Sequence, residues 1–479
     1  MDDGVGPVEG SVEVRREQVD GLHGRARPQV EADDLVDIVA LYQQGGHPAP
    51  QDARRSGHHY TNHAVSMPLA AGEHHIARTM VSMSSGPNPF EGMPFFGDLL
   101  KMLGTQGPVQ WDGARQLALS IATGGESEPN VDPLERVRYE QLARVADLQV
   151  AQATGLSTST TGRAVAIMPV TRAQYALTTL DAYRPLIERM AAALHPPAAE
   201  VEAVDPAEGG DPTEAWLGQI MGLLSPMLLG MTTGSLVGHL STRTFGLFDL
   251  PIPRPPSDDI LVVAPNVEAF ATDWSMEGDD LRLWVCLQQL THHAVLGLPH
   301  VRDRLNQLLG DYASAFESDP DALGTKLGDL EADPSAGDPM ARFQELLGDP
   351  EVVLGAVRSA RQEALLPWLE GLVCVIEGYV DHIMDQIGTG LVGSYAQITE
   401  AVRRRRVEAS AQDRFVERLL GLELTQAHFD RGAAFVAGVV ERAGSEGLER
   451  LWESADVLPT PNEVDAPGLW LARIDLPEA

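Results

Sequence analysis

Three polar residues near the middle of the chain, Gln288, Gln289 and His292, lie in an apolar segment at a spacing that matters for metal chemistry. In the pattern His-Glu-x-x-His, the two histidines are four residues apart and therefore share one face of a helix. They bind one zinc ion together, while the glutamate takes a proton from the zinc-bound water. Here Gln288 stands at the position of the first histidine and Gln289 at that of the glutamate.

Both substitutions weaken the expected chemistry. The neutral amide oxygen of Gln288 is a much poorer zinc ligand than an imidazole nitrogen. Gln289 has nearly the shape of glutamate but cannot accept a proton, and general-base catalysis is typically worth about 100- to 10,000-fold in rate. Taken alone, His292 behind two glutamines predicts only a hydrogen-bonded polar side chain on a packed helix.

The element that must position these residues is a helix. The segment Asp280–Pro299, DLRLWVCLQQLTHHAVLGLP, predicts an apolar helix over Asp279–Leu296, and its acidic first turn suits the positive end of the helix dipole. His293 follows His292 and points about 100° further around the helix. We therefore expect His293 beside the site, in its second shell of contacts, and not on a metal.

Several longer blocks carry a resemblance to a known family. They are FEGMPFFGDLLKML, GPVQWDGARQLALSIA, ARVADLQVAQATGL, PNVEAFATDWSMEGDDLRLWVCLQQLTHHAVLGLPHVRDRL, LEGLVCVIEGYVDHIMDQI and VLPTPNEVDAPGLWLARID. On these blocks the chain, from about Phe90 to its end, resembles an actinobacterial zincin-like family of proposed hydrolases and zinc-dependent metalloproteases. Some members of that family carry a label for coenzyme F420 biosynthesis. Family members typically show LHELTHHAV where this chain has LQQLTHHAV.

The resemblance implies a zincin-like metallopeptidase fold, mainly α with a small β-sheet, and zinc held by the helix motif and a third ligand. We assign the third ligand to Glu377, in the segment EGYVDH. The fourth coordination position of the zinc ion is then left for water. Asp381 lies one turn further along the same face and is expected to orient His292 through a hydrogen bond. Without the family, Glu377 and Asp381 predict only a solvated helix face.

For this copy of the family we predict weak or lost zinc binding and impaired hydrolysis. The alternative is a non-catalytic binding or scaffold protein that uses the zincin cleft as a groove for a peptide or protein partner. An error confined to this one sequence is a third explanation of the two glutamines. A rearranged metal site built from His292, His382 and carboxylates is less favoured, because His382 does not lie at a useful spacing from Glu377.

Composition narrows the remaining classes of function. The 479 residues include 69 acidic and 35 basic side chains, a formal charge of −34 that opposes binding to nucleic acid. The two cysteines lie in apolar helical runs, which excludes a disulfide framework and fits a reducing cytoplasm. There is no phosphate-binding loop of the form G-x-x-x-x-G-K-[ST]. The run Arg403–Arg406 is expected on a solvated helix face.

The amino-acid composition of the first eighty residues differs from that of the rest of the chain. Its first eighty residues contain no Lys, Phe or Trp but hold seven of the fourteen histidines. We predict that residues 1–82 are disordered or stem from a start codon placed too early, and no secretory signal is visible. A metal-binding role for the histidines there is disfavoured, because no amphipathic helix surrounds them. Residues 83–479 form the zincin-like domain, with a helical part over about 83–250 and a metal-site part over about 255–479.

The apolar periodicity predicts mostly helices and one strand. Glycines recur at four-residue spacing within Leu217–Leu240, which predicts a tightly packed helix pair in preference to a membrane span. The proline-punctuated end, Leu458–Ala479, predicts irregular structure. The other predicted helices cover 132–154, 171–194, 214–229, 301–316, 351–387, 395–406, 409–420 and 425–443, and the strand covers 260–263.

Overall fold

The computed structural model describes residues 107–194, 212–318, 356–357, 359–408, 417, 419–422 and 424–476, with backbone only for 212–224, 318 and 356–357. All of them belong to one compact unit, Pro87–Ala479. The predictions made for residues 1–82 and for their histidines lie outside the described residues, as does nearly all of the helix predicted over 409–420.

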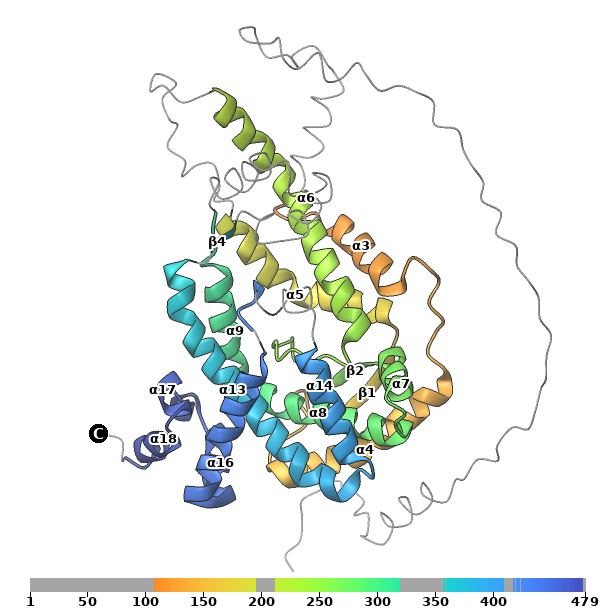
Figure 1. Ribbon diagram of the computed structural model, residues 1–479, viewed down its shortest axis with the longest axis vertical. Helices are drawn as coiled ribbons and strands as arrows, with labels where there is room; N and C mark the ends of the chain where they lie inside the picture. Colours follow the sequence, from red (N-terminus) through yellow and green to blue (C-terminus); the bar gives the residue numbers. More distant parts are fainter. Residues whose placement is uncertain are drawn as a thin grey trace, which may run out of the picture. The chain divides into compact units, whose positions relative to one another are not determined.

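The described residues are mainly helical, with two small sheets, as the sequence predicted (Figure 1). Strand β1 (Ala166–Val170) pairs in parallel with β2 (Asp259–Val263), and β3 (Glu317–Ser318) pairs antiparallel with β4 (Ala356–Val357). The helices are α3 (Trp111–Thr123), α4 (Pro133–Thr154), α5 (Arg172–Leu194), α6 (Pro212–Arg243), α7 (Ala264–Asp273), α8 (Gly278–Leu296), α9 (Pro299–Ala313), α13 (Ala360–Leu391), α14 (Tyr395–Val407), α16 (Gln426–Glu449), α17 (Pro461–Val464) and α18 (Pro467–Ile474).

Helix α8, which carries the motif, is buried on all sides. From Leu281 to Leu296 every side chain except that of Arg282 is buried. A helix that is apolar around its whole circumference belongs in the core of a domain. It packs there against α4, α13, α9 and β2. The helix predicted over Asp279–Leu296 is confirmed to within one residue.

Strand β2 confirms the strand predicted over 260–263, and both of its edges are occupied. One edge pairs with β1, which the sequence reading missed because Pro169 interrupts its apolar run. The other edge is covered by the chain after α6, where Gly246 forms a bridge with Val262. There the backbone N–H of Leu247 donates to the carbonyl of Leu261 at 3.2 Å.

The glycine-rich run forms part of α6 and packs closely on α3, as predicted. A Cβ atom on Gly230 would lie 2.6 Å from the carbonyl oxygen of Gln110, and one on Gly238 would lie 2.7 Å from Cβ of Ile121. Only residues without a side chain let the two helices approach this far. Among the described helices, none has the length and apolarity needed to cross a membrane.

Several element boundaries differ from prediction. Helix α6 continues well beyond the predicted end at Leu229, with Pro226 inside it. The end of the chain that was predicted to be irregular contains α17 and α18. Trp470 of α18 is fully buried and packs against Phe435 of α16. Burial of this one large aromatic residue orders a segment that its prolines made look irregular.

Helix α13, which carries Glu377, is fixed at its start and along its length. Ser359 and Gln362 form a reciprocal capping box at its N-terminus, with the amide N–H of Gln362 donating to Ser359 Oγ at 3.2 Å. Further along, α13 and α16 touch backbone to backbone at Gly378 and Gly432 (Figure 1). The position of Glu377, next to Gly378, depends on this contact.

We predict that Gly432→Ala destabilises the protein by about 1 to 3 kcal/mol, because its Cβ would overlap the carbonyl of Cys374 in α13. The matched control is Gly390→Ala in α13, the helix that Gly432 of α16 contacts, because nothing lies within 4 Å of the new Cβ there. That change should be neutral or stabilising by up to about 1 kcal/mol. Urea unfolding of the two variants would measure both effects, and equal effects would contradict the close helix contact.

Candidate metal-type site

Helices α8 and α13 bring His292 and Glu377 together in the core. Nε2 of His292 lies 3.1 Å from Oε1 of Glu377, and Nδ1 of the same ring lies 3.0 Å from the carbonyl oxygen of Gln288. The two side chains are only 1% and 5% exposed. Both ring nitrogens of His292 are therefore engaged by protein atoms.

The partners of His292 determine where its protons lie. The carbonyl of Gln288 can only accept a hydrogen bond, so Nδ1 carries a hydrogen. Nε2 of a neutral ring and the carboxylate of Glu377 would both be acceptors, so their contact requires a proton between them. Burial alone would lower the pKa of His292, but the charge and hydrogen bond of Glu377 outweigh burial and raise it. The contact with Glu377 therefore favours the protonated ring.

Gln289 is fully buried, and both ends of its amide are bonded to protein. Its Oε1 accepts from the backbone N–H of Phe248 at 2.9 Å. Its Nε2 donates to Oδ1 of Asp249 and to Oε1 of Gln288, each at 3.1 Å. Phe248 and Asp249 belong to the loop Thr244–Leu250, which connects α6 to the chain leading to β2. The residue at the position of the general base therefore serves as a structural hydrogen-bonding group.

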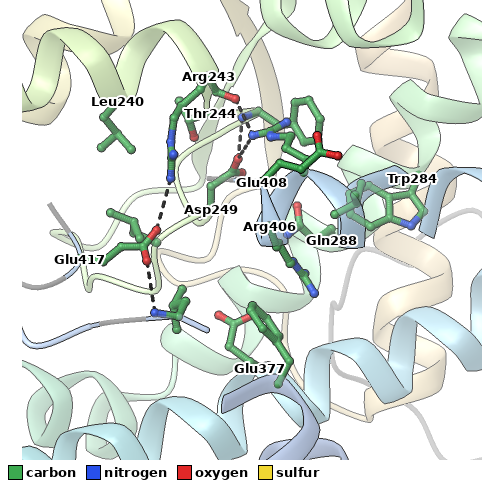
Figure 2. Close-up of a pocket in the computed structure, with 16 residues that line it drawn as sticks. Leu240, Arg243, Thr244, Asp249, Trp284, Gln288, Glu377, Arg406, Glu408 and Glu417 are labelled. Atoms are coloured by element: carbon green, nitrogen blue, oxygen red, sulfur yellow. Dashed lines mark hydrogen bonds and ion pairs between the residues drawn. The ribbon is translucent and has the colours of Figure 1, made fainter. Parts of the chain in front are cut away.

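A cavity of about 310 Å³, called the cleft below, adjoins this cluster. Figure 2 shows Gln288 and Glu377 facing it from α8 and α13. Gln288 is 8% exposed, so this amide, unlike that of Gln289, is open to the cleft. Of the predicted site residues, Gln288 and Glu377 thus line the cleft, while His292 lies behind Glu377.

The cleft wall carries charges of both signs, arranged in pairs. Arg243 lies 3.2 Å from Glu417, and Arg405 lies 3.5 Å from Asp249. The aromatic side chains of Phe245, Trp284 and Phe429 complete much of the remaining wall. The cleft is therefore a polar pocket whose wall carries three arginines and four carboxylates beside apolar patches.

Two cleft residues come from the arginine run of α14, and here the prediction of a solvated face is wrong. Arg405 and Arg406 line the cleft and stack on the rings of Phe245 and Phe429, with their Cζ atoms 3.9 and 3.8 Å from the ring centres. Arg404 does point to solvent, where it pairs with a glutamate of the same helix. Successive residues of a helix point about 100° apart, so a run of four arginines necessarily covers more than one face.

The two residues that were predicted to support the site without binding metal, Asp381 and His293, have contacts of their own. Asp381 is 39% exposed and lies 3.6 Å from Arg406, whereas both nitrogens of His292 have other partners. Asp381 therefore pairs with Arg406 of the cleft. No hydrogen bond joins Asp381 to His292.

His293 faces a different cavity, of about 430 Å³, on another side of α8. Its Nε2 lies 3.9 Å from Oδ1 of Asp258, and its ring centre lies 5.9 Å from that of Phe248. Burial lowers the pKa of His293. As expected from the helix geometry, His293 is not directed at the same ligand position as His292.

These residues do not fit a catalytic zinc ion. Such a site needs three protein ligands with free lone pairs and an open fourth position. Here the donors are one imidazole, one carboxylate and the amide of Gln288, whose neutral oxygen is a poor zinc ligand. Across the described parts of the chain, no cluster of three or more His, Cys, Asp or Glu side chains is arranged to hold a metal ion, which also leaves the alternative site with His382 without support.

The pair of His292 and Glu377 predicts a pH-dependent stability. Because the folded-state pKa of His292 is raised above its usual value of about 6.5, the stabilisation is fully present below that pH and is lost as pH rises through the folded-state pKa. In Glu377→Gln the attracting charge is absent, so this loss should be smaller. Urea unfolding of both proteins between about pH 6 and pH 9 tests this; parallel curves would contradict the shared proton.

Comparison with known proteins gives two findings. The family model described as zincin-like metallopeptidase matches residues 109–471. The crystal structure of a proposed hydrolase with a novel fold, from Chloroflexus aurantiacus, is 22% identical in sequence with a TM-score of 0.52, and the match covers 77% of this chain and 100% of that one. This likeness concerns the fold. No curated protein matches the sequence. The family match covers most of the chain, which therefore belongs to the zincin-like metallopeptidase family.

Proposed function

We propose that this chain is a zincin-like protein that has lost zinc-dependent hydrolysis and uses its cleft to bind a short peptide. The observation that carries the proposal is the donor set where α8 meets α13: one imidazole, His292, one carboxylate, Glu377, and the neutral amide of Gln288. A catalytic zinc ion needs three protein ligands, and an amide oxygen is a much poorer ligand than an imidazole nitrogen.

The missing base supports the same conclusion. Gln289 has no basic atom, its amide is fully used by Phe248, Asp249 and Gln288, and the side chain does not line the cleft. A water molecule in the cleft therefore has neither a metal ion to lower its pKa nor a carboxylate at position 289 to take its proton.

The cleft itself is retained. Its volume of about 310 Å³ lies at the lower end of the range of small-molecule sites, about 300 to 1,000 Å³. Paired charges and aromatic rings on its wall suit a ligand with both a positive and a negative group and an apolar body. A peptide of two or three residues has these properties, and a peptide is also the ligand class that the family suggests.

Two further expectations belong to this proposal. The formal charge of −34 disfavours nucleic acid as a partner. Cys286 and Cys374 are free thiols in the protein interior, and burial raises the pKa of Cys374 to about 11. Free cysteines fit a reducing compartment, so we place the protein in the cytoplasm.

The first test is metal content. Purified protein, equilibrated with zinc chloride and then dialysed, should retain no more zinc than the His292→Ala variant when both are measured by elemental analysis. It should also leave fluorescent casein uncleaved. About one zinc per chain, lost in His292→Ala and accompanied by casein cleavage, would contradict the loss of hydrolysis.

The second test is peptide binding. A mixture of tryptic casein peptides should give saturation-transfer NMR signals with the intact protein. These signals should be lost in Leu424→Trp, which enlarges a half-buried side chain on the cleft wall. The matched control is Leu469→Trp, because Leu469 is 61% exposed and lies outside the cleft. Equal binding by all three proteins, or by none, would contradict a peptide site in the cleft.

A further inference from the structure

The loop Thr244–Leu250 separates two cavities. Thr244, Phe245, Asp249 and Leu250 line the cleft, whereas Leu247 and Phe248 line the 430 Å³ cavity that His293 faces. The same loop covers the edge of β2 that β1 leaves open. The shape of both cavities, and access to this strand edge, therefore depend on what holds the loop in place.

Two side chains satisfy three backbone N–H groups of the loop. The carboxylate of Asp249 accepts from Phe245 N at 2.7 Å and from Gly246 N at 3.2 Å. The amide oxygen of Gln289 accepts from Phe248 N at 2.9 Å. Buried N–H groups without a partner are costly, so these bonds favour the closed loop over an open one. The 3.1 Å bond between Gln289 Nε2 and Asp249 Oδ1 joins the two side chains into one unit.

The loop also fits closely around the amide. A Cβ atom on Gly246 would lie 2.5 Å from Oε1 of Gln289 and 3.0 Å from the carbonyl oxygen of Leu261. Glycine at this position thus lets the loop lie between α8 and β2. The contact shows that residue 289 is part of the packing of the loop as well as of its hydrogen bonds.

The contacts of Gln289 require an amide and not an acid. Its Nε2 donates two hydrogen bonds, to Asp249 Oδ1 and Gln288 Oε1, and the carboxylate of Asp249 has no hydrogen to give in return. A glutamate here would place a second carboxylate oxygen about where Nε2 now lies, 3.1 Å from Asp249. Two such oxygens without a hydrogen between them repel each other in a site of low dielectric.

We propose that Asp249 and Gln289 form an acid–amide pair that fixes the loop between the two cavities, so that position 289 cannot return to glutamate while residue 249 is aspartate. The missing general base is then one half of a structural pair, and Asp249 is its positioning partner. This inference goes beyond the proposed function, because it holds whether or not the cleft binds a peptide.

The test is an exchange of the two chemical groups. In Gln289→Glu, hydrogen exchange of the Phe245, Gly246 and Phe248 amides, followed by mass spectrometry of the peptide that contains them, should become about 10- to 100-fold faster. Adding Asp249→Asn places the amide on the loop and the acid on the helix. The new loop amide would then donate to the new helix carboxylate with its nitrogen at the place of Oδ1, while its oxygen, at the place of Oδ2, still accepts from Phe245 N. Protection should therefore return at Phe245 and Phe248 but not at Gly246, whose N–H loses its acceptor.

A matched control separates this pairing from a simple change of net charge. Asp381→Asn removes the same charge from a carboxylate that contacts Arg406 and not Gln289. In the Gln289→Glu background it should restore no protection. Three results would overturn the proposal: unchanged exchange in Gln289→Glu, no recovery with Asp249→Asn, or equal recovery with Asp381→Asn. Circular dichroism of each variant identifies any that fail to fold, and global unfolding of Gln289→Glu alone, reversed by Asp249→Asn, would also support the pair.

Discussion

A buried imidazole ring must find a partner for each of its two nitrogens, and the centre of this molecule is arranged around that requirement for His292. One partner, the carbonyl of Gln288, comes from the preceding turn of the same helix. The other, Glu377, comes from α13, more than eighty residues later in the chain. A metal ion would satisfy Nε2 in an intact member of the family. In this structure the carboxylate of Glu377 contacts Nε2, so the environment of the buried ring depends on the relative position of α8 and α13.

The sequence specifies that relative position at several points outside the site. The capping box of Ser359 and Gln362 sets where α13 begins, and Gly378 with Gly432 lets α16 press directly on its backbone. Helix α8 also packs against α4 and β2. These contacts are made by side chains and backbone away from the motif, so the zincin-like fold does not depend on the motif residues alone. Scaffold and catalytic motif are separate properties of the sequence.

The parts of this structure that could be predicted are those that depend on residues close together in the sequence. The apolar periodicity gave α8 to within one residue, and the glycine spacing of α6 indicated its close packing partner. The approach of Glu377 to the motif helix came only from the family resemblance, because spacing along the chain carries no information on which distant helices meet. Arg405, Arg406 and Asp249 were missed for the same reason. Their role depends on a loop and a helix end that only tertiary structure brings to the cleft.

The two glutamines of the degenerate motif are not equivalent. Gln288 faces the cleft and contributes one acceptor to the local network, so its side chain is one of many that the site would tolerate. Gln289 faces away from the cleft, toward the loop, and its two donated bonds and one accepted bond match the groups that it meets. A change at 288 alters what the cleft offers to a ligand, whereas a change at 289 alters the wall of the cleft itself. The amide at position 289, which cannot act as a base, is therefore also the group that hydrogen-bonds the loop.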